Sequence, residues 1–337
     1  MRKSIKKHIE DKIQGGIIGF MIGDAMGLPI AGMRKSDVLR HVGIVKKYIN
    51  NFRHPFAYFL KEGQYGSNSR LLISSLQSLV KNGKYNRLDL KRRLTQIARK
   101  SKADFFYSRW IGETITKTLL SGEASFSNSC TCIYYSIPLS FFINDLNELA
   151  KIVEENSKLT HISPISLAAS TFVTRLLFHL KGGKKNAQLY IEEAAQFAGK
   201  KYKGSEKLIE NILLASNKNK IKNVEIARKV FGTGSLAYQT IPLSIYIFLN
   251  NMNNFENAII AGVNSYRDDQ EEEKKLRYVS YPEELIHCRG GATDGIASLV
   301  GSFIGCYIGY SQIPKKFLSD LEDRNKVQRL ISSFFHD

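Results

Sequence analysis

Apolar residues recur at helical spacing along most of the chain. Residues 70–80 (RLLISSLQSLV) place four leucines and a valine on one face of a predicted α-helix. The same pattern occurs in residues 90–98, 111–120, 165–180, 189–198, 208–215 and 241–249. Residues 133–142 have local strand propensity, but no alternating run between hairpin turns accompanies them. We therefore expect an all-α fold and, without a linker or internal repeat, a single domain over residues 1–337.

Two predicted helices carry a small residue at every fourth position. The first stripe is Gly15, Gly19, Gly23 and Gly27, and the second is Ala297, Gly301, Gly305 and Gly309. Each glycine inside a helix costs about 1 kcal/mol relative to alanine, so the stripes need a compensating gain. Small residues on one face let two helices approach closely, and we expect these two helices to pack tightly in the core.

Three polar groups inside or next to predicted helices are candidate functional sites. Asp24 interrupts the first stripe, where an unpaired carboxylate is costly, so it should cap a backbone, pair with a cation or face a site. Residues 290–295 (GGATDG) form a glycine-rich loop before a helix, which favours anion binding. Residues 66–69 (GSNS) precede another helix, and their side chains are typical helix caps.

Charge and cysteine content exclude only a few classes of function. Lysine and arginine total 49 against 31 acids, a net charge of +18, with basic clusters at residues 2–7, 91–102, 181–185 and 200–222. No nucleic-acid-binding motif accompanies the clusters, which argues against nucleic acid as the partner. Four cysteines indicate a reducing compartment rather than a disulfide scaffold. The C-x-C spacing of Cys130 and Cys132 is not the usual zinc pattern, so we expect buried free thiols.

The apolar stretches do not predict a membrane span. Residues 15–33 are interrupted by Asp24 and six glycines, and residues 296–310 are shorter than the roughly 20 residues that a span needs. The basic amino terminus resembles the start of a signal peptide, but Glu10 and Asp11 separate it from the apolar run. We expect a cytoplasmic protein; an effector secreted without a cleavable signal remains an open alternative.

Several motifs follow one another in a definite order. Residues 15–29 match G-x-x-x-G-x-x-x-G-D-A-x-G-x-P, and residues 64–69 (QYGSNS) stand where a T-D-D-T motif would precede a helix. Thr160 and His161, residues 231–234 (FGTG) and residues 290–294 (GGATD) come next. Over about residues 13–320, this order resembles the ADP-ribosylglycohydrolase family, which includes the dinitrogenase-reductase-activating glycohydrolases. The resemblance implies a compact orthogonal helical bundle and removal of ADP-ribose from modified side chains.

The resemblance also implies a two-metal site that this sequence has largely lost. Members of the family hold two Mg²⁺ or Mn²⁺ ions with the T-D-D-T and D-T-D-T motifs. The matching positions here are Gly66, Ser67, Asn68, Ala292, Asp294 and Gly295. Only Asp294 keeps a carboxylate, and the family's glutamate and arginine fall at Ala31 and Tyr135. We therefore expect no firmly held cofactor, with Mg²⁺ or Mn²⁺ at most at a weakened single site on Asp294.

An insertion of about residues 265–289 separates a helix end from the glycine-rich loop. The relatives lack this stretch, which contains acids that include Glu283 and Glu284. It is either a solvated surface loop or a lid that supplies replacement acids.

Three hypotheses remain open from the sequence. The first is a pseudoenzyme that binds ADP-ribose or a related nucleotide. Its ligand-binding residues would be Ser67, Asn68, Ser69, Gly232, Gly234, Gly290, Gly291 and Thr293. The second is a hydrolase of ADP-ribosyl or other N-glycosidic bonds that works through a metal-poor site, with Asp24 and Asp294 as the catalytic candidates. The third is a basic interaction module.

Overall fold

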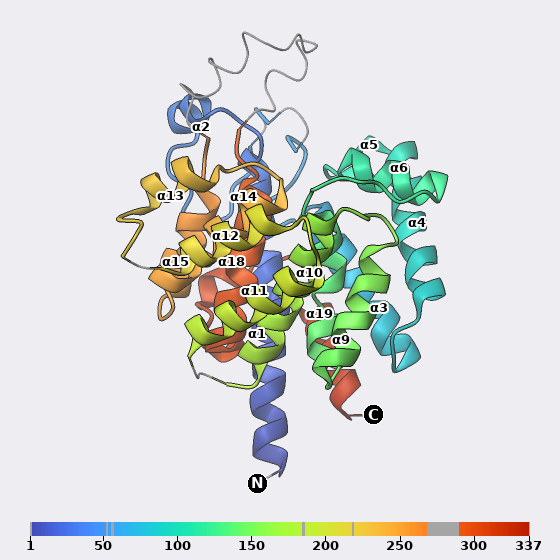
Figure 1. Cartoon of the computed structure of the whole chain (residues 1–337). Helices are drawn as coiled ribbons and strands as arrows, with labels where there is room; N and C mark the ends of the chain where they lie inside the picture. The colour runs from blue at the N-terminus through green and yellow to red at the C-terminus, as the bar shows by residue number, and fades with distance from the viewer. Residues whose placement is uncertain are drawn as a thin grey trace.

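The computed structural model describes residues 2–51, 53–54, 57–183, 186–217, 219–267 and 290–336. Every regular element within these ranges is a helix, and pairing between extended segments is limited to two isolated bridges (Figure 1). The expected all-α fold is therefore confirmed.

Seven helices of fourteen residues or more form the frame. They are α1 (Arg2–Gly27), α3 (Ser67–Asn82), α4 (Arg87–Ala103), α10 (Pro164–Lys181), α11 (Ala187–Lys201), α14 (Ala237–Asn250) and α18 (Thr293–Ile308). Shorter helices are α2 (Lys35–His41), α5 (Phe105–Ser108), α6 (Glu113–Ser121), α7 (Thr131–Ser136), α8 (Leu139–Phe142), α9 (Leu146–Ser157), α12 (Glu206–Ser216), α13 (Val224–Phe231), α15 (Phe255–Val263) and α19 (Arg324–His336). Three short 3₁₀ segments are η1 (Leu28–Ile30), η2 (Tyr310–Gln312) and η3 (Lys315–Phe317).

The helix starts follow the local sequence closely. Asn86, Asn186 and Asn223 each accept a hydrogen bond from a backbone N–H in the first turn of the helix that follows. These caps satisfy donors that have no partner inside the helix. Residues 133–142 also prove helical, because the chain turns at Pro138 between α7 and α8 instead of running as a strand.

The two glycine stripes face each other and bring α1 and α18 into backbone contact. A Cβ placed on Gly19 would lie 2.1 Å from the carbonyl oxygen of Gly301, and one on Gly23 would lie 2.1 Å from that of Ala297. Such distances leave no room for a side chain, so the expected tight packing is confirmed. Figure 1 shows α1 and α18 side by side at the centre, with α10, α14 and α15 around them.

Within the described residues, one helix is long and apolar enough to cross a membrane by length and composition alone. It covers Ile5–Ile30, includes most of α1, and 94% of its most apolar window is buried inside the protein. A core helix of a soluble protein gives the same result. The core position of α1, rather than a lipid environment, accounts for its apolar character.

Candidate ligand-binding cleft

The carboxylate of Asp24 joins the end of α1 to the start of α3. Asp24 is fully buried, and its Oδ2 accepts hydrogen bonds from the backbone N–H groups of Gly66 at 3.0 Å and Ser69 at 2.8 Å. Gly66 has no side chain with which to cap α3, so the carboxylate from a distant helix takes that role. Asp24 therefore fixes the position of the GSNS segment.

Burial makes the charged form of Asp24 costly. Burial, followed by the negative charge of Asp294, raises the pKa of Asp24 to about 7, although the hydrogen bonds from Ser69 and Gly66 act in the opposite direction. The second oxygen, Oδ1, is buried without a hydrogen-bond partner in the described part of the chain. The fold therefore favours the neutral form of Asp24 to a higher pH than for an exposed aspartate.

Asn68 and Asp294 meet between the starts of α3 and α18. The Nδ2 amide of Asn68 donates to Oδ2 of Asp294 at 2.9 Å. Asn68 is 8% exposed, whereas Asp294, in the first turn of α18, is partly exposed. Burial raises the pKa of Asp294 above its ordinary value. A neutral amide thus occupies one oxygen of the single carboxylate at the predicted metal position.

The described residues do not fit a two-metal cluster. None of them form a group of three or more His, Cys, Asp or Glu side chains that could hold a metal ion. A Cβ on Gly295 would lie 2.6 Å from the hydroxyl of Tyr134, and one on Gly66 would lie 2.8 Å from Leu28, so a side chain at either position would require the end of its neighbour to shift. The motif positions lack the carboxylate charge that two divalent cations need.

The loop that precedes α18 is fastened to the end of α1. The N–H of Gly290 donates to the carbonyl of Gly32 at 2.7 Å, and the N–H of Gly32 donates to the carbonyl of Gly291 at 3.0 Å. Thr293 is 1% exposed, and its hydroxyl donates to the carbonyl of Gly27 at 2.8 Å. These hydrogen bonds join the start of α18 to the end of α1. The contact of Gly290, Gly291 and Thr293 with a ligand stays a prediction.

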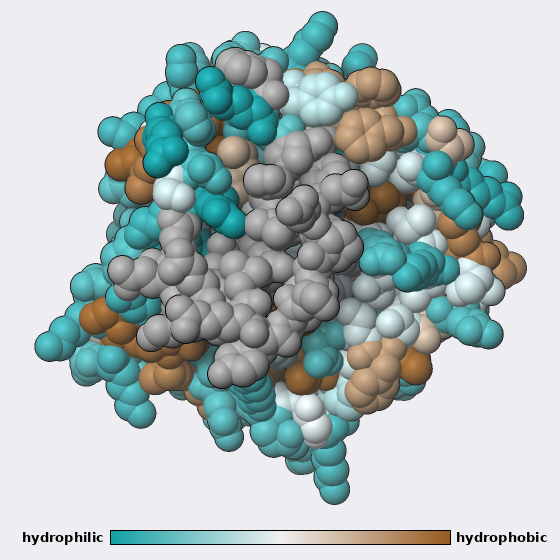
Figure 2. All heavy atoms as spheres, turned by 90° about the horizontal axis from the view of Figure 1, so that it is seen from above, coloured by the Kyte–Doolittle hydropathy of each residue, from teal (hydrophilic) through white to brown (hydrophobic). Residues whose placement is uncertain are grey.

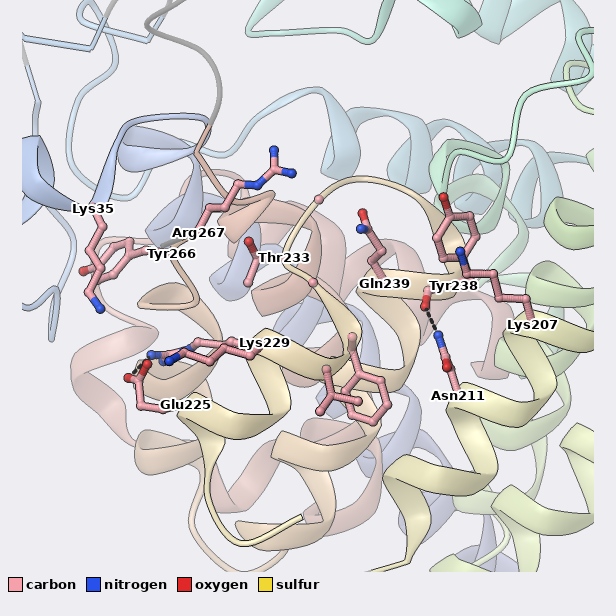
Figure 3. Close-up of a pocket in the computed structure, with 15 residues that line it drawn as sticks. Lys35, Lys207, Asn211, Glu225, Lys229, Thr233, Tyr238, Gln239, Tyr266 and Arg267 are labelled. Carbon is pink, nitrogen blue, oxygen red and sulfur yellow. Dashed lines mark hydrogen bonds and ion pairs between the residues drawn. The ribbon is translucent and has the colours of Figure 1, made fainter. Parts of the chain in front are cut away.

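The predicted Gly232 and Gly234 lie in the turn between α13 and α14. The carbonyl of Thr233, between them, accepts a hydrogen bond from the N–H of Ala292 at 2.7 Å, which joins this turn to the start of α18. The turn also lines a pocket of about 470 Å³ that Asp24, Asn68 and Asp294 do not line (Figure 3).

The sequence analysis did not identify the two residues after α5 that contact Ser67. Arg109 and Trp110 adopt left-handed backbone conformations, with φ of 43° and 61°. Their carbonyls accept hydrogen bonds from the N–H of Ser67 at 3.1 Å and from its hydroxyl at 2.8 Å. The Arg109 guanidinium also forms a two-bond ion pair with Glu322. No motif marks these positions, and Glu322 lies over 200 residues away in sequence.

His161 belongs to a buried hydrogen-bond network. Its Nε2 lies 2.7 Å from the hydroxyl of Ser129, and its Nδ1 lies 2.7 Å from that of Thr160. The Thr160 hydroxyl in turn lies 2.6 Å from that of Tyr135, which stands at the family's arginine position. Burial lowers the pKa of His161 to about 4, so the ring is neutral and serves to hold these segments together.

The remaining predictions concern thiols and the insertion. Cys130, Cys132 and Cys306 are free and buried, as expected. Residues 268–289 lie outside the described residues, and with them Glu283, Glu284 and the hypothesis of a lid.

Comparisons with known proteins point to one family over nearly the whole length of this chain. The family model described as ADP-ribosylglycohydrolase matches residues 6–337. The chain is 21% identical to ADP-ribosylhydrolase ARH3 of Homo sapiens, with 96% of this chain and 92% of the relative covered. It is 19% identical to ADP-ribosylarginine hydrolase Tri1 of Serratia proteamaculans, covering 97% and 79%. A solved ADP-ribosylglycohydrolase-related protein complex superposes with a TM-score of 0.69 at 16% identity, covering 98% of this chain and 99% of that one.

Proposed function

This chain belongs to the ADP-ribosylglycohydrolase family, and from that premise we propose that it binds an ADP-ribose-like group without two-metal hydrolysis. The observation that carries the proposal is the Asn68–Asp294 contact, in which an amide donor takes the place of a cation beside the carboxylate. The frame of the cleft is retained through Asp24, while the charge that would hold metal ions is not.

The site favours a ligand with hydroxyl groups. The carboxylates of Asp24 and Asp294 already lie at the first turns of α3 and α18, so these helix dipoles leave little attraction for a further negative group. Asn68 keeps its carboxamide oxygen for a further hydrogen bond, which suits a ribose hydroxyl. Relatives that are named for the removal of ADP-ribosyl groups support this ligand class for the chain.

Turnover by the family's metal-dependent route is not expected. Cleavage of a glycosidic bond needs a group that protonates the leaving atom and another that activates water. Asp24 is fully buried and already binds two backbone amides, so it is poorly placed to contact a substrate. Without Asp24, Asp294 supplies one carboxylate where the reaction needs two groups. Binding without hydrolysis therefore accounts better for the residues present.

Calorimetric titration of ADP-ribose into the full chain, with and without millimolar Mg²⁺ or Mn²⁺, tests the proposal. We expect binding that does not depend on the metal, and Asn68→Ala should weaken it by about tenfold, the effect of losing roughly 1.4 kcal/mol. Asn257→Ala, at an exposed asparagine of α15, is the matched control and should bind normally. Absence of binding, or binding that requires the metal, would contradict the proposal.

A second candidate function is slow hydrolysis by a metal-poor site. It is favoured by the direction in which burial shifts the pKa of Asp294, because a higher pKa brings a carboxyl group closer to the range in which it can act as a general acid. Release of free ADP-ribose from an ADP-ribosylated arginine peptide would reveal it. Turnover that persists with a chelator and disappears in Asp294→Asn would establish this candidate in place of the first.

We propose that residues 1–337 form one ADP-ribosylglycohydrolase-like domain, because α1 near the start packs along α18 near the end. We also propose a cytoplasmic location, because the free, buried thiols of the described residues fit a reducing compartment.

A further inference from the structure

The pocket beside the Gly232–Gly234 turn is strongly basic. Its cationic side chains come from four parts of the chain and are Lys35, Lys207, Arg228, Lys229 and Arg267. Glu225 is the one carboxylate among the described lining residues. Figure 3 shows these side chains around the turn, with Lys35 and Arg267 on one side and Lys207 on the other. Seen from above, the surface of the molecule carries hydrophilic side chains interspersed with apolar patches (Figure 2).

Arg228 is a largely buried cation of the pocket. Its side chain is 13% exposed, and its Nη1 donates to Glu225 at 2.5 Å. The Nε–H is buried without a hydrogen-bond partner in the described part of the chain. Because Glu225 is 57% exposed, water screens its charge and it compensates Arg228 only in part. A buried donor of this kind gains stability from an added acceptor.

The turn itself contributes a second unsatisfied group. Thr233 is 3% exposed, and its hydroxyl has no hydrogen-bond partner among the described residues. The turn requires Gly232, whose φ of +81° is unfavourable for a side chain. In Figure 3 the Thr233 hydroxyl lies centrally between the basic residues and Gln239. The Thr233 hydroxyl, the Arg228 guanidinium and the lysine ammonium groups therefore belong to residues that line the same pocket.

This arrangement suits phosphate better than a carboxylate. Five cations against one acid exceed what a single negative charge would need, and guanidinium groups bind phosphate oxygens in pairs. A volume of about 470 Å³ is typical of sites for small ligands. We propose that this pocket binds a small molecule that carries two or more phosphate groups. The site goes beyond the proposed Asn68–Asp294 site, since, of the predicted ADP-ribose contacts, its lining includes only Gly232 and Gly234.

Titration of inorganic tripolyphosphate into the full chain at about 0.15 M salt tests the assignment, because screening at that ionic strength weakens unspecific surface binding. We expect saturable binding at one site. Arg228→Gln with Lys229→Gln should lower the affinity by at least about tenfold, or roughly 1.4 kcal/mol. Thr233→Val keeps the side-chain shape, removes the hydroxyl, and should weaken binding without disturbing the fold. Thermal unfolding of each variant separates lost binding from lost structure.

Matched controls give each outcome a meaning. Lys84→Gln with Arg99→Gln removes two exposed charges near and on α4, across the molecule from α13 in Figure 1, and should leave binding unchanged. Asn257→Ala, the exposed control on α15, should also leave it unchanged. Equal losses in the two charge variants would show unspecific attraction and overturn the proposal. Absence of saturable binding, or tighter pocket-dependent binding of a 20-nucleotide RNA, would overturn it as well.

Discussion

Replacing Asp24 by asparagine should change how stability depends on pH. The substitution keeps one oxygen that can accept the N–H groups of Gly66 and Ser69, and it removes only the charge. In the native protein the carboxyl group is fully buried and near a second carboxylate, Asp294, so the fold favours its neutral form.

The magnitude follows from the shift in pKa. Folding raises the pKa of Asp24 from its ordinary value of 3.8 to about 7. Each pKa unit corresponds to about 1.4 kcal/mol, so ionisation of this group in the folded state costs about 4 kcal/mol. Because the folded pKa is the higher one, the stabilising contribution is fully present below pH 3.8. It is lost progressively as the pH rises, until the group is ionised in both states above pH 7.

Urea unfolding of the native chain and Asp24→Asn at several pH values between 5 and 8, followed by circular dichroism, measures the effect. The free energy of unfolding of the variant relative to the native chain should increase by roughly 2–3 kcal/mol across this range. Asp320→Asn, at an exposed carboxylate, should instead run parallel to the native chain. Parallel curves for Asp24→Asn would refute the assignment of a buried, partly protonated carboxyl group.

Three further outcomes are expected. Gly301→Ala should lower the free energy of unfolding by about 3 kcal/mol in urea titrations, since its Cβ would lie 2.0 Å from the Gly19 carbonyl oxygen; unchanged stability would contradict the close helix contact. Arg109→Lys should cost about 1–2 kcal/mol in the same assay, because lysine loses the two-bond pairing with Glu322; a smaller loss than for an exposed arginine would argue against that role. In a Cys288→Ser background, the three described cysteines should resist a thiol reagent at pH 8 and react after denaturation, because burial raises the pKa of each to about 12; rapid native labelling would contradict this.

Local patterns predicted the helices and the central packing. The periodicity of residues 70–80 lies within α3, and the two glycine stripes meet as expected, because both depend on spacing within one segment. For residues 111–120 the helix begins at Glu113, since Gly112 is extended and caps it. The local strand propensity of residues 133–142 does not produce a strand, as expected from the missing alternation, because burial between helices outweighs it.

The cleft was harder to anticipate because its contacts join distant segments. The sequence offered three roles for Asp24, and only the structure shows that it caps α3 across 42 residues. The pairing of Arg109 with Glu322 carries no local signal at all. The closeness of Tyr134 to Gly295 likewise depends on how α7 meets α18, and it explains why a missing side chain at Gly295 is tolerated.

The contact between α1 and α18 also has a consequence for biosynthesis. The main partner of α1 is a helix encoded about 270 residues later, so this pairing waits until α18 has been synthesised. Until then, an apolar segment long enough to span a bilayer lacks its native cover. Long-range pairing of this kind slows folding and leaves nascent chains prone to aggregate. The protein should therefore depend on chaperones that hold its amino-terminal helix during synthesis.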